Sequence, residues 1–271
     1  MKQILTIGLV LLLSSAEAQQ HSLQKIWETD SIVAVPESVL YTKDGMFVSL
    51  IDGAPWESDG KGGIARIGVD GKNYNGTWIS GLNAPKGLGI YGNNLYAADM
   101  GDVVVVDIQK GAVQKRIPIP GASGLNDITV SDKGIVYVSD SRNNRIWRIN
   151  NGDPQLFMDS VAGVNGLKAV GNNLLVAAGK NFISVNPQKQ VTKIAELPLG
   201  LDGIEPIGNG DYLTTAWNGF VYYVYADGRV ETLLDATKDK KNTADLGYDP
   251  VKKILYVPTF NGKTVAAYQL K

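Results

Sequence analysis

Short apolar runs recur along the chain, and each is bounded by residues that favour tight turns. A run at residues 39–41 is followed by Thr42-Lys43-Asp44-Gly45 and then by a second run at residues 46–50. An Asp-Gly pair supplies the positive φ that a hairpin turn needs. Strands that are apolar on both faces are typical of sheets buried between other sheets. Further runs of this kind lie at residues 95–98, 136–139, 174–177, 212–215 and 255–258.

One short sequence motif occurs six times, at a spacing of about 40 residues. It consists of a variable residue, a small or turn-forming residue, and an aliphatic residue that begins a strand, as in Asp202-Gly203-Ile204. A repeat of this length, with only strand-like content between, is typical of a β-propeller with one four-stranded blade per repeat. We therefore predict an all-β, six-bladed β-propeller. The variable residues are Glu37, Lys86, Asn126, Asn165, Asp202 and Ala244.

The two ends of the chain complement each other. Residues 22–35 contain one strand and a connector, and they resemble the end of another repeat at residues 191–197. The last repeat stops after a third strand, at residues 264–270. We expect the N-terminal strand to complete the last blade, because this closure leaves no unpaired sheet edge at the seam.

The first residues have the features of an export signal. Lys2 precedes an apolar run at residues 4–13, and Ala16-Glu17-Ala18 fits the small-residue pattern of a cleavage site. We expect a cleaved signal peptide at residues 1–18 and a single propeller domain at residues 19–271, in a periplasmic or secreted protein. No later stretch is long enough to cross a bilayer, so no membrane association is expected after cleavage.

Composition narrows the possible chemistry. The chain has no cysteine, and its only histidine, His21, lies near the mature N-terminus. These facts exclude thiolate sites and a Ser-His-Asp triad, and they argue against zinc. The net charge is −1, and the only basic cluster, at residues 238–241, includes Asp239, so no nucleic-acid partner is expected. We expect a monomer that acts on a small molecule.

The repeat brings a set of polar residues to one face of the propeller. Strands alternate in direction, so the loops that enter the innermost strands share a face with the turns between second and third strands. Carboxylate and amide oxygens are hard donors, which predicts a site for Ca²⁺, with Mg²⁺ or Mn²⁺ as alternatives. The expected ligands are Glu37, Asn126, Asn165 and Asp202, with Lys86 beside them.

A local explanation of these residues also exists. Asn and Asp occur in turns for reasons of backbone geometry alone. A purely structural turn residue should keep its identity from blade to blade, whereas the six positions read Glu, Lys, Asn, Asn, Asp and Ala. This variation favours a binding site. Asp127 and Asp245 stand one position later and are assigned to packing between blades.

Residues on the same face are candidates for substrate binding: Lys86, Trp56, Arg142 and Trp217. Trp56 belongs to an expanded turn at residues 52–63, which is either a tolerated surface loop or a wall of the site. Phe260 lies on a further turn of this face.

From residue 36 to residue 260 the chain resembles the regucalcin and gluconolactonase (senescence marker protein) family of six-bladed propeller hydrolases. The resemblance implies a divalent cation on Glu37, Asn126, Asn165 and Asp202, with Asp202 as base or nucleophile; we assign catalytic roles to Asp202 and Glu37. The sugar-lactonase branch has an arginine two residues before the first metal-binding asparagine, where this chain has Gly124. This departure argues against sugar lactones and leaves the hydrolase class intact. Lys86 or Arg142 could supply the missing charge.

The leading hypothesis is an exported, divalent-metal-dependent hydrolase, a lactonase that opens a cyclic ester at the propeller axis. One alternative is a propeller that binds a ligand or a protein without catalysis, since the fold hosts both kinds of function. Another is a phosphotriesterase that uses the same cation.

Overall fold

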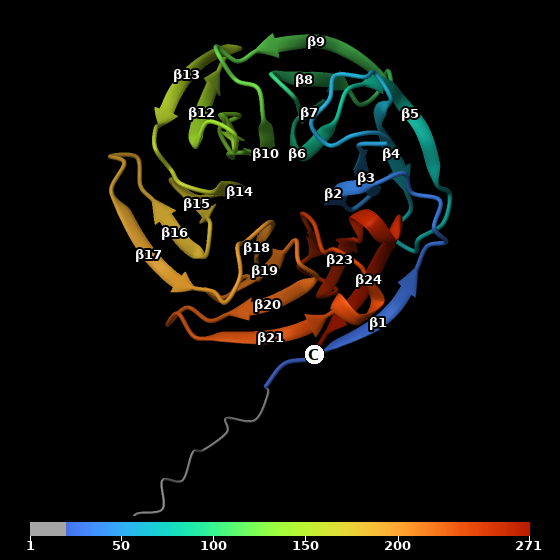
Figure 1. Cartoon of the computed structure of the whole chain (residues 1–271), viewed down its shortest axis with the longest axis vertical. Coiled ribbons are helices and arrows are strands. Elements are labelled where there is room, and N and C mark those ends of the chain that lie inside the picture. The colour runs from blue at the N-terminus through green and yellow to red at the C-terminus, as the bar shows by residue number, and fades with distance from the viewer. Residues whose placement is uncertain (1–19) are drawn as a thin grey trace, which may run out of the picture.

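The computed structural model describes residues 20–271, so the expected signal peptide at residues 1–18 lies outside the described residues. The described chain forms six four-stranded antiparallel sheets around a central axis (Figure 1). In five of them the strands follow in chain order from the axis outward. The all-β, six-bladed prediction is thereby confirmed. No helix within residues 20–271 is long and apolar enough to cross a membrane.

The blades follow the sequence repeat. Blade one consists of β2 (Pro36–Thr42), β3 (Gly45–Leu50), β4 (Gly62–Ile67) and β5 (Asn75–Leu82). Blade two consists of β6 (Pro85–Tyr91), β7 (Asn94–Asp99), β8 (Asp102–Asp107) and β9 (Ala112–Pro118). Blade three consists of β10 (Leu125–Val130), β11 (Val136–Asp140), β12 (Arg145–Asn150) and β13 (Asp153–Met158). Blades four and five consist of β14 (Val164–Val170), β15 (Asn173–Ala178), β16 (Asn181–Val185) and β17 (Val191–Glu196); and β18 (Ile204–Pro206), β19 (Tyr212–Ala216), β20 (Phe220–Val224) and β21 (Val230–Asp235).

Blade six joins the two ends of the chain. Its strands are β22 (Gly247–Asp249), β23 (Ile254–Pro258), β24 (Val265–Leu270) and β1 (Leu23–Glu28). Two single turns of 3₁₀ helix, η1 (Thr237–Asp239) and η2 (Phe260–Gly262), flank this blade. Each apolar run expected as a second strand lies inside β3, β7, β11, β15, β19 or β23.

The hydrophobic core is divided among the spaces between blades. Six buried clusters occur, and each combines residues of two neighbouring blades. One cluster packs Val103 and Val105 of blade two against Leu125 and Val138 of blade three. This arrangement explains why the middle strands are apolar on both faces, since each blade is covered by a neighbour on either side.

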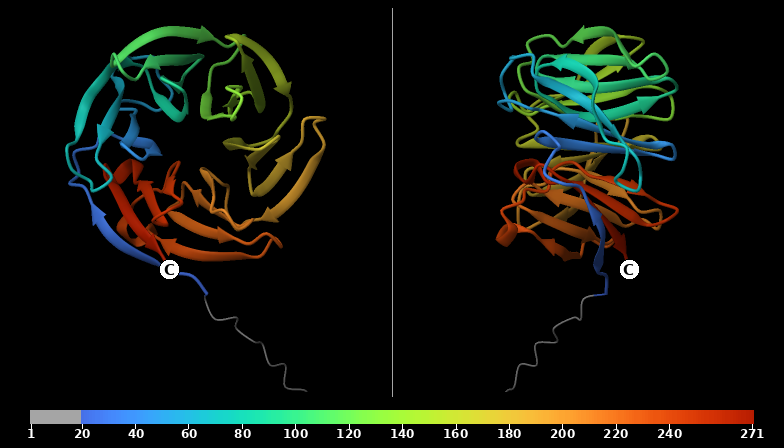
Figure 2. Two further views of the ribbon diagram at one scale, coloured as in Figure 1. Left: turned by 180° about the vertical axis from the view of Figure 1, so that it is seen from behind. Right: turned by 90° about the vertical axis from the view of Figure 1, so that its right-hand side faces the viewer.

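The closure of the ring has the predicted form. β1 pairs antiparallel with β24 along the outer edge of blade six, so the N-terminal strand is the fourth strand of the last blade (Figure 2). Near the axis, the N–H of Val39 donates to the Asp245 carbonyl at 3.1 Å, and the N–H of Asp245 donates to the Glu37 carbonyl at 2.9 Å. Blades one and six are therefore joined at the inner strand as well as through β1.

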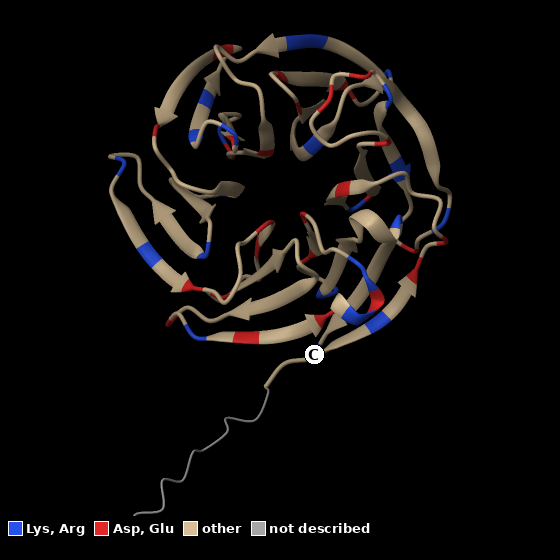
Figure 3. Ribbon diagram, viewed as in Figure 1, with Lys and Arg blue, Asp and Glu red and all other residues tan. Residues whose placement is uncertain are grey.

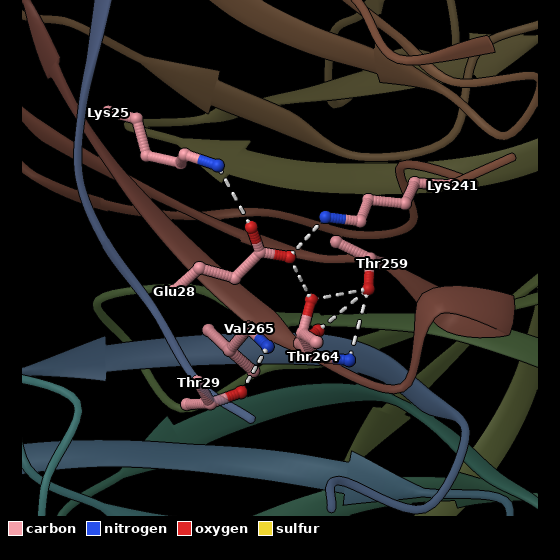
Figure 4. Close-up of polar contacts among 7 residues, drawn as sticks. All are labelled: Lys25, Glu28, Thr29, Lys241, Thr259, Thr264 and Val265. Carbon is pink, nitrogen blue, oxygen red and sulfur yellow. Dashed lines mark hydrogen bonds and ion pairs between the residues drawn. The ribbon is translucent and has the colours of Figure 1, made fainter. Parts of the chain in front are cut away.

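Glu28, at the end of β1, is the centre of a polar cluster that holds the outer seam (Figure 4). Its Oε1 accepts hydrogen bonds from Lys241 Nζ and, at 2.6 Å, from Thr264 Oγ1, and its Oε2 accepts one from Lys25 Nζ at 3.1 Å. Burial alone would raise the pKa of Glu28, but these hydrogen bonds outweigh burial and lower it to about 2. The carboxylate thus ties the first strand to the last turn of the chain.

We expect Glu28→Gln to lower the free energy of unfolding at neutral pH by about 1–3 kcal/mol, because it removes charge-assisted hydrogen bonds at the seam. The pKa of Glu28 is lowered on folding, so its stabilisation is present above the unfolded pKa and is lost as pH falls from about 4.5 toward 2. The gap between wild type and variant should therefore narrow in acid. Urea denaturation at several pH values measures it.

The matched control is Glu196→Gln, which removes an exposed carboxylate paired with Lys193 on β17. It should change stability by less than about 0.5 kcal/mol. Equal effects of the two variants would show that Glu28 contributes no more than a surface ion pair.

Candidate functional site

The residues expected at the axis come from the inner ends of five blades. Glu37 lies in β2, Lys86 in β6, Asn126 in β10 and Asn165 in β14, while Asp202 stands two residues before β18. In the first four blades the pairing between the first and second strands shifts in register around the variable residue of the repeat. The shifts lie between residues 36 and 39, 85 and 88, 125 and 128, and 164 and 167. Such bulges turn a side chain away from the regular pleat.

Hydroxyl groups of the second strands stabilise these irregular inner strands in alternate blades. Ser49 Oγ accepts the N–H of Ser38, Ser139 Oγ accepts that of Asp127, and Thr215 Oγ1 accepts that of Gly203, at 2.8 to 2.9 Å. In each case the donor directly follows the variable residue of its repeat. The bond satisfies a buried N–H that the register shift, or the short strand β18, leaves without a ladder partner.

The structure brings five of the six variable residues of the repeat, all except Ala244, into one pocket with a volume of about 260 Å³. Figure 3 shows charged segments at the central ends of β2 and β6. Arg142 does not line this pocket, but its guanidinium carbon lies 5.0 Å from the centre of the Trp56 ring. The lining residues are Glu37, Lys86, Asn126, Asn165 and Asp202 together with Pro55, Trp56, Trp217 and Phe260.

The donor set fits a hard divalent cation. Glu37, Asn126 and Asp202 are between 4% and 8% exposed. Glu37 Oε2, Asn126 Oδ1 and Asn165 Oδ1 are buried and have no hydrogen-bond partner. Buried oxygens without partners are costly, and carboxylate and amide oxygens that share one pocket are the donors that a hard cation takes. Residues 20–271 contain no group of three or more His, Cys, Asp or Glu residues that could hold a metal. From this set the pocket has only the two carboxylate residues Glu37 and Asp202, so the other expected ligands are amides.

The electrostatics of the pocket point the same way. Burial, and then the charge of Asp202, raise the pKa of Glu37 well above its usual range. Burial, and then the charge of Asp245, raise the pKa of Asp202 to about 8. Burial also lowers the pKa of Lys86 to about 8, against the attraction of Glu37. A bound divalent cation would balance the two carboxylate charges and favour their ionised forms.

Asp127 and Asp245 contact the neighbouring blades rather than the pocket. Asp127 accepts the N–H of Leu167 in blade four, and Asp245 Oδ2 accepts the hydroxyl of Ser38 in blade one at 2.6 Å. Both therefore take part in the packing between blades that the sequence suggested.

The sequence reasoning missed an ion pair inside the channel. Lys168 Nζ lies 2.6 Å from Glu205 Oε1, and both residues line a cavity of about 140 Å³ together with Asp127 and Asp245. Lys168 and Glu205 stand three residues after Asn165 and Asp202, so a charged residue at the same offset in two adjacent repeats could have revealed them. Pro55 was missed because it acts through its carbonyl, which accepts a hydrogen bond from Lys86 at 2.7 Å.

Comparison with known proteins supports the propeller. The NHL repeat family model matches residues 123–149, and no curated protein matches significantly. One similar structure is a protein of unknown function from Bacteroides thetaiotaomicron, with a TM-score of 0.72, 13% identity, and coverage of 94% of this chain and 77% of that chain.

Two further similar structures are lyases. A streptogramin B lyase has a TM-score of 0.65 and 10% identity, and covers 93% of this chain and 97% of that chain. Virginiamycin B lyase from Staphylococcus aureus has a TM-score of 0.63 and 14% identity, and covers 92% and 99% of the two chains. Identities this low establish the fold alone, so membership of the regucalcin and gluconolactonase family stays a prediction.

We expect Ca²⁺ to raise the melting temperature and a chelator to lower it. The four expected ligands come from four blades, so the unfolded chain cannot bind the cation with all of them. Binding to the folded state alone contributes about 3 kcal/mol at a hundredfold excess over the dissociation constant. Asp202→Ala should abolish this response, while Asp132→Ala, in an exposed turn between β10 and β11, should keep it. Scanning fluorimetry measures the melting temperatures. Equal calcium-induced shifts of the melting temperature in wild type and Asp202→Ala would show that the cation binds elsewhere.

The metal-free protein should lose stability as pH rises from about 5 to about 8. Because the pKa values of Glu37 and Asp202 are raised on folding, the folded chain retains protons that the unfolded chain has released, and this advantage disappears as pH passes the folded pKa. Asp202→Asn should make the loss of stability less steep, while Glu37, Asp127 and Asp245 still contribute to it. Urea denaturation in chelator across this range measures the slope, and an unchanged slope in the variant would exclude Asp202 as a contributor.

Proposed function

We propose that this propeller is a divalent-metal-dependent hydrolase that opens a lactone or a related small ester in the axial pocket. The observation that carries the proposal is the set of buried oxygens without partners on Glu37, Asn126 and Asn165, facing the same pocket as the buried carboxylate of Asp202. Buried oxygens without a hydrogen-bond partner also occur on Asp59, Asp140 and Thr214, but those residues do not line the pocket, whereas these three gather in it.

Glu37, Asn126, Asn165 and Asp202 would hold the cation. When bound, a divalent cation polarises an ester carbonyl and stabilises negative charge on its oxygen. The two carboxylates balance the charge of the cation, and the two amide oxygens complete an oxygen-only set that suits Ca²⁺.

Asp202 would move the proton in this reaction. Its carboxylate would take a proton from a water molecule as the water oxygen adds to the ester carbonyl carbon. The bond from carbon to the ring oxygen then breaks, and the protonated Asp202 returns its proton to that oxygen, which leaves as an alcohol. Direct attack by Asp202, followed by hydrolysis of the acyl-enzyme, is the other route open to the same residue.

Aromatic side chains would bind the apolar part of the substrate. Trp217 is 44% exposed, and its ring packs edge-on against Phe260 with centroids 5.7 Å apart. Trp56 forms another part of the lining. A pocket of this volume with aromatic walls suits a small cyclic molecule better than a polymer.

Elimination is the second candidate reaction, because two of the similar structures are lyases. In an elimination a base removes a proton from the carbon next to the alkyl carbon, the bond between that alkyl carbon and the ester oxygen breaks, and the products are a carbon–carbon double bond and a free carboxylate. Hydrolysis in heavy-oxygen water places the label in the product carboxylate, whereas elimination does not.

The test is turnover of a panel of small lactones and aryl esters with added Ca²⁺. Asp202→Asn should reduce kcat at least about hundredfold, the size expected when a general base is removed. A chelator should abolish activity and Ca²⁺ should restore it, while Asp132→Asn should behave as wild type. Full activity in metal-free protein, or in Asp202→Asn, would overturn the proposal.

A further inference from the structure

Arg142 is a cation without an anionic partner beside Trp56, which lines the pocket. It is exposed, and within residues 20–271 it makes no hydrogen bond or ion pair. Its guanidinium instead lies over Trp56. By contrast Arg145, three residues along the same blade, is paired with Asp159 at 3.4 Å. A stacked guanidinium keeps its hydrogen-bond donors free for a ligand in the plane of the group.

The absence of a side chain at Gly124 permits this position of Arg142. A Cβ atom on Gly124 would lie 2.4 to 2.7 Å from three carbon atoms of the Arg142 side chain, which is too close for real atoms. Any larger residue at position 124 would therefore displace the arginine. From the turn between β11 and β12, the Arg142 side chain occupies the space that the glycine leaves and brings a positive charge beside position 124.

Lys86 adds a second cation on the same side of the pocket. Its Nζ is 4.1 Å from the centre of the Trp56 ring and donates to the carbonyls of Pro55 and Ala84 at 2.7 and 3.0 Å. Two of its three donors are thus used, and the hydrogen bond to Pro55 holds the Trp56 loop in place. Burial lowers the pKa of Lys86 most, and the charge of Arg142 lowers it further, so the two cations interact.

Two positive charges lie beside Trp56, and the only carboxylates that line this pocket are the expected cation ligands. A divalent cation would offset Glu37 and Asp202, which leaves Lys86 and Arg142 without a carboxylate in the pocket lining. Another part of the lining is apolar, with Trp217 against Phe260. A neutral substrate would leave both positive charges unused, whereas an anionic group beside the ester would complete the set.

We propose that the substrate of this pocket carries a carboxylate next to its ester, and that Arg142, held over Gly124 and stacked on Trp56, binds that carboxylate and determines specificity. That the substrate contains an ester rests on the proposed hydrolase function. That it carries a carboxylate rests only on the positive side chains of Lys86 and Arg142. A guanidinium matches a carboxylate with two parallel hydrogen bonds, which a lysine ammonium cannot form.

The test compares a γ-lactone bearing a ring carboxylate with the same lactone bearing a carboxamide. Wild-type protein should prefer the carboxylate in kcat/KM by about tenfold or more, the range of one charge-assisted pair. Arg142→Gln should remove this preference, mainly by raising the KM of the carboxylate lactone. Gly124→Ala should act in the same direction, because it displaces the guanidinium without removing it. Arg145→Gln is the matched control and should equal wild type.

A binding measurement separates this inference from the reaction. Calorimetric titration of calcium-loaded protein with tetrahydrofuran carboxylate, which has no ester, should show binding that Arg142→Gln weakens about tenfold. If no lactone is turned over but this difference is seen, the hydrolase proposal fails and the carboxylate site stands. Equal affinity in wild type and Arg142→Gln, absence of binding to both, or equal use of the two lactones would overturn the carboxylate site.

Discussion

The close approach of the innermost strands around the axis is the constraint on which the pocket depends. A Cβ atom on Gly166 would lie 1.9 Å from the carbonyl oxygen of Asp202, so blades four and five can meet there only through a glycine. The register shifts beside Glu37, Lys86, Asn126 and Asn165 occur at the same depth of the channel. Because the backbones meet so closely, oxygens from four blades can share one pocket.

That convergence has an electrostatic cost. Glu37 and Asp202 are buried within reach of each other, with Asp127 and Asp245 below them, and the pKa of each of these carboxyls is raised, chiefly by burial. Lys168 and Glu205 pair with each other deeper in the channel and add no net charge. Proteins retain such unfavourable clusters where a ligand compensates them. The hydrophobic clusters between blades and the double closure of blade six supply the stability that the axis lacks.

The polar and aromatic parts of the pocket lining come from different parts of the repeat. The polar residues stand at equivalent positions of the repeat, whereas Trp56, Trp217 and Phe260 lie in turns that differ in length and composition. Trp56 reaches the pocket only because its turn is long, and Lys86 fixes that turn through the Pro55 carbonyl. A repeat fold can in this way keep one set of oxygen donors and change the walls around them.

The sequence by itself determined the number of blades, the closure by the N-terminal strand and the set of residues at the axis. These follow from periodicity, since an equal offset within each repeat gives an equal depth in the channel. Only the tertiary structure decided that the oxygens of Glu37, Asn126 and Asn165 lack partners, that Lys168 pairs with Glu205, and that Arg142 occupies the space over Gly124. Those facts depend on side-chain directions and on contacts between blades about 40 residues apart, which a local pattern of apolar and polar residues does not encode.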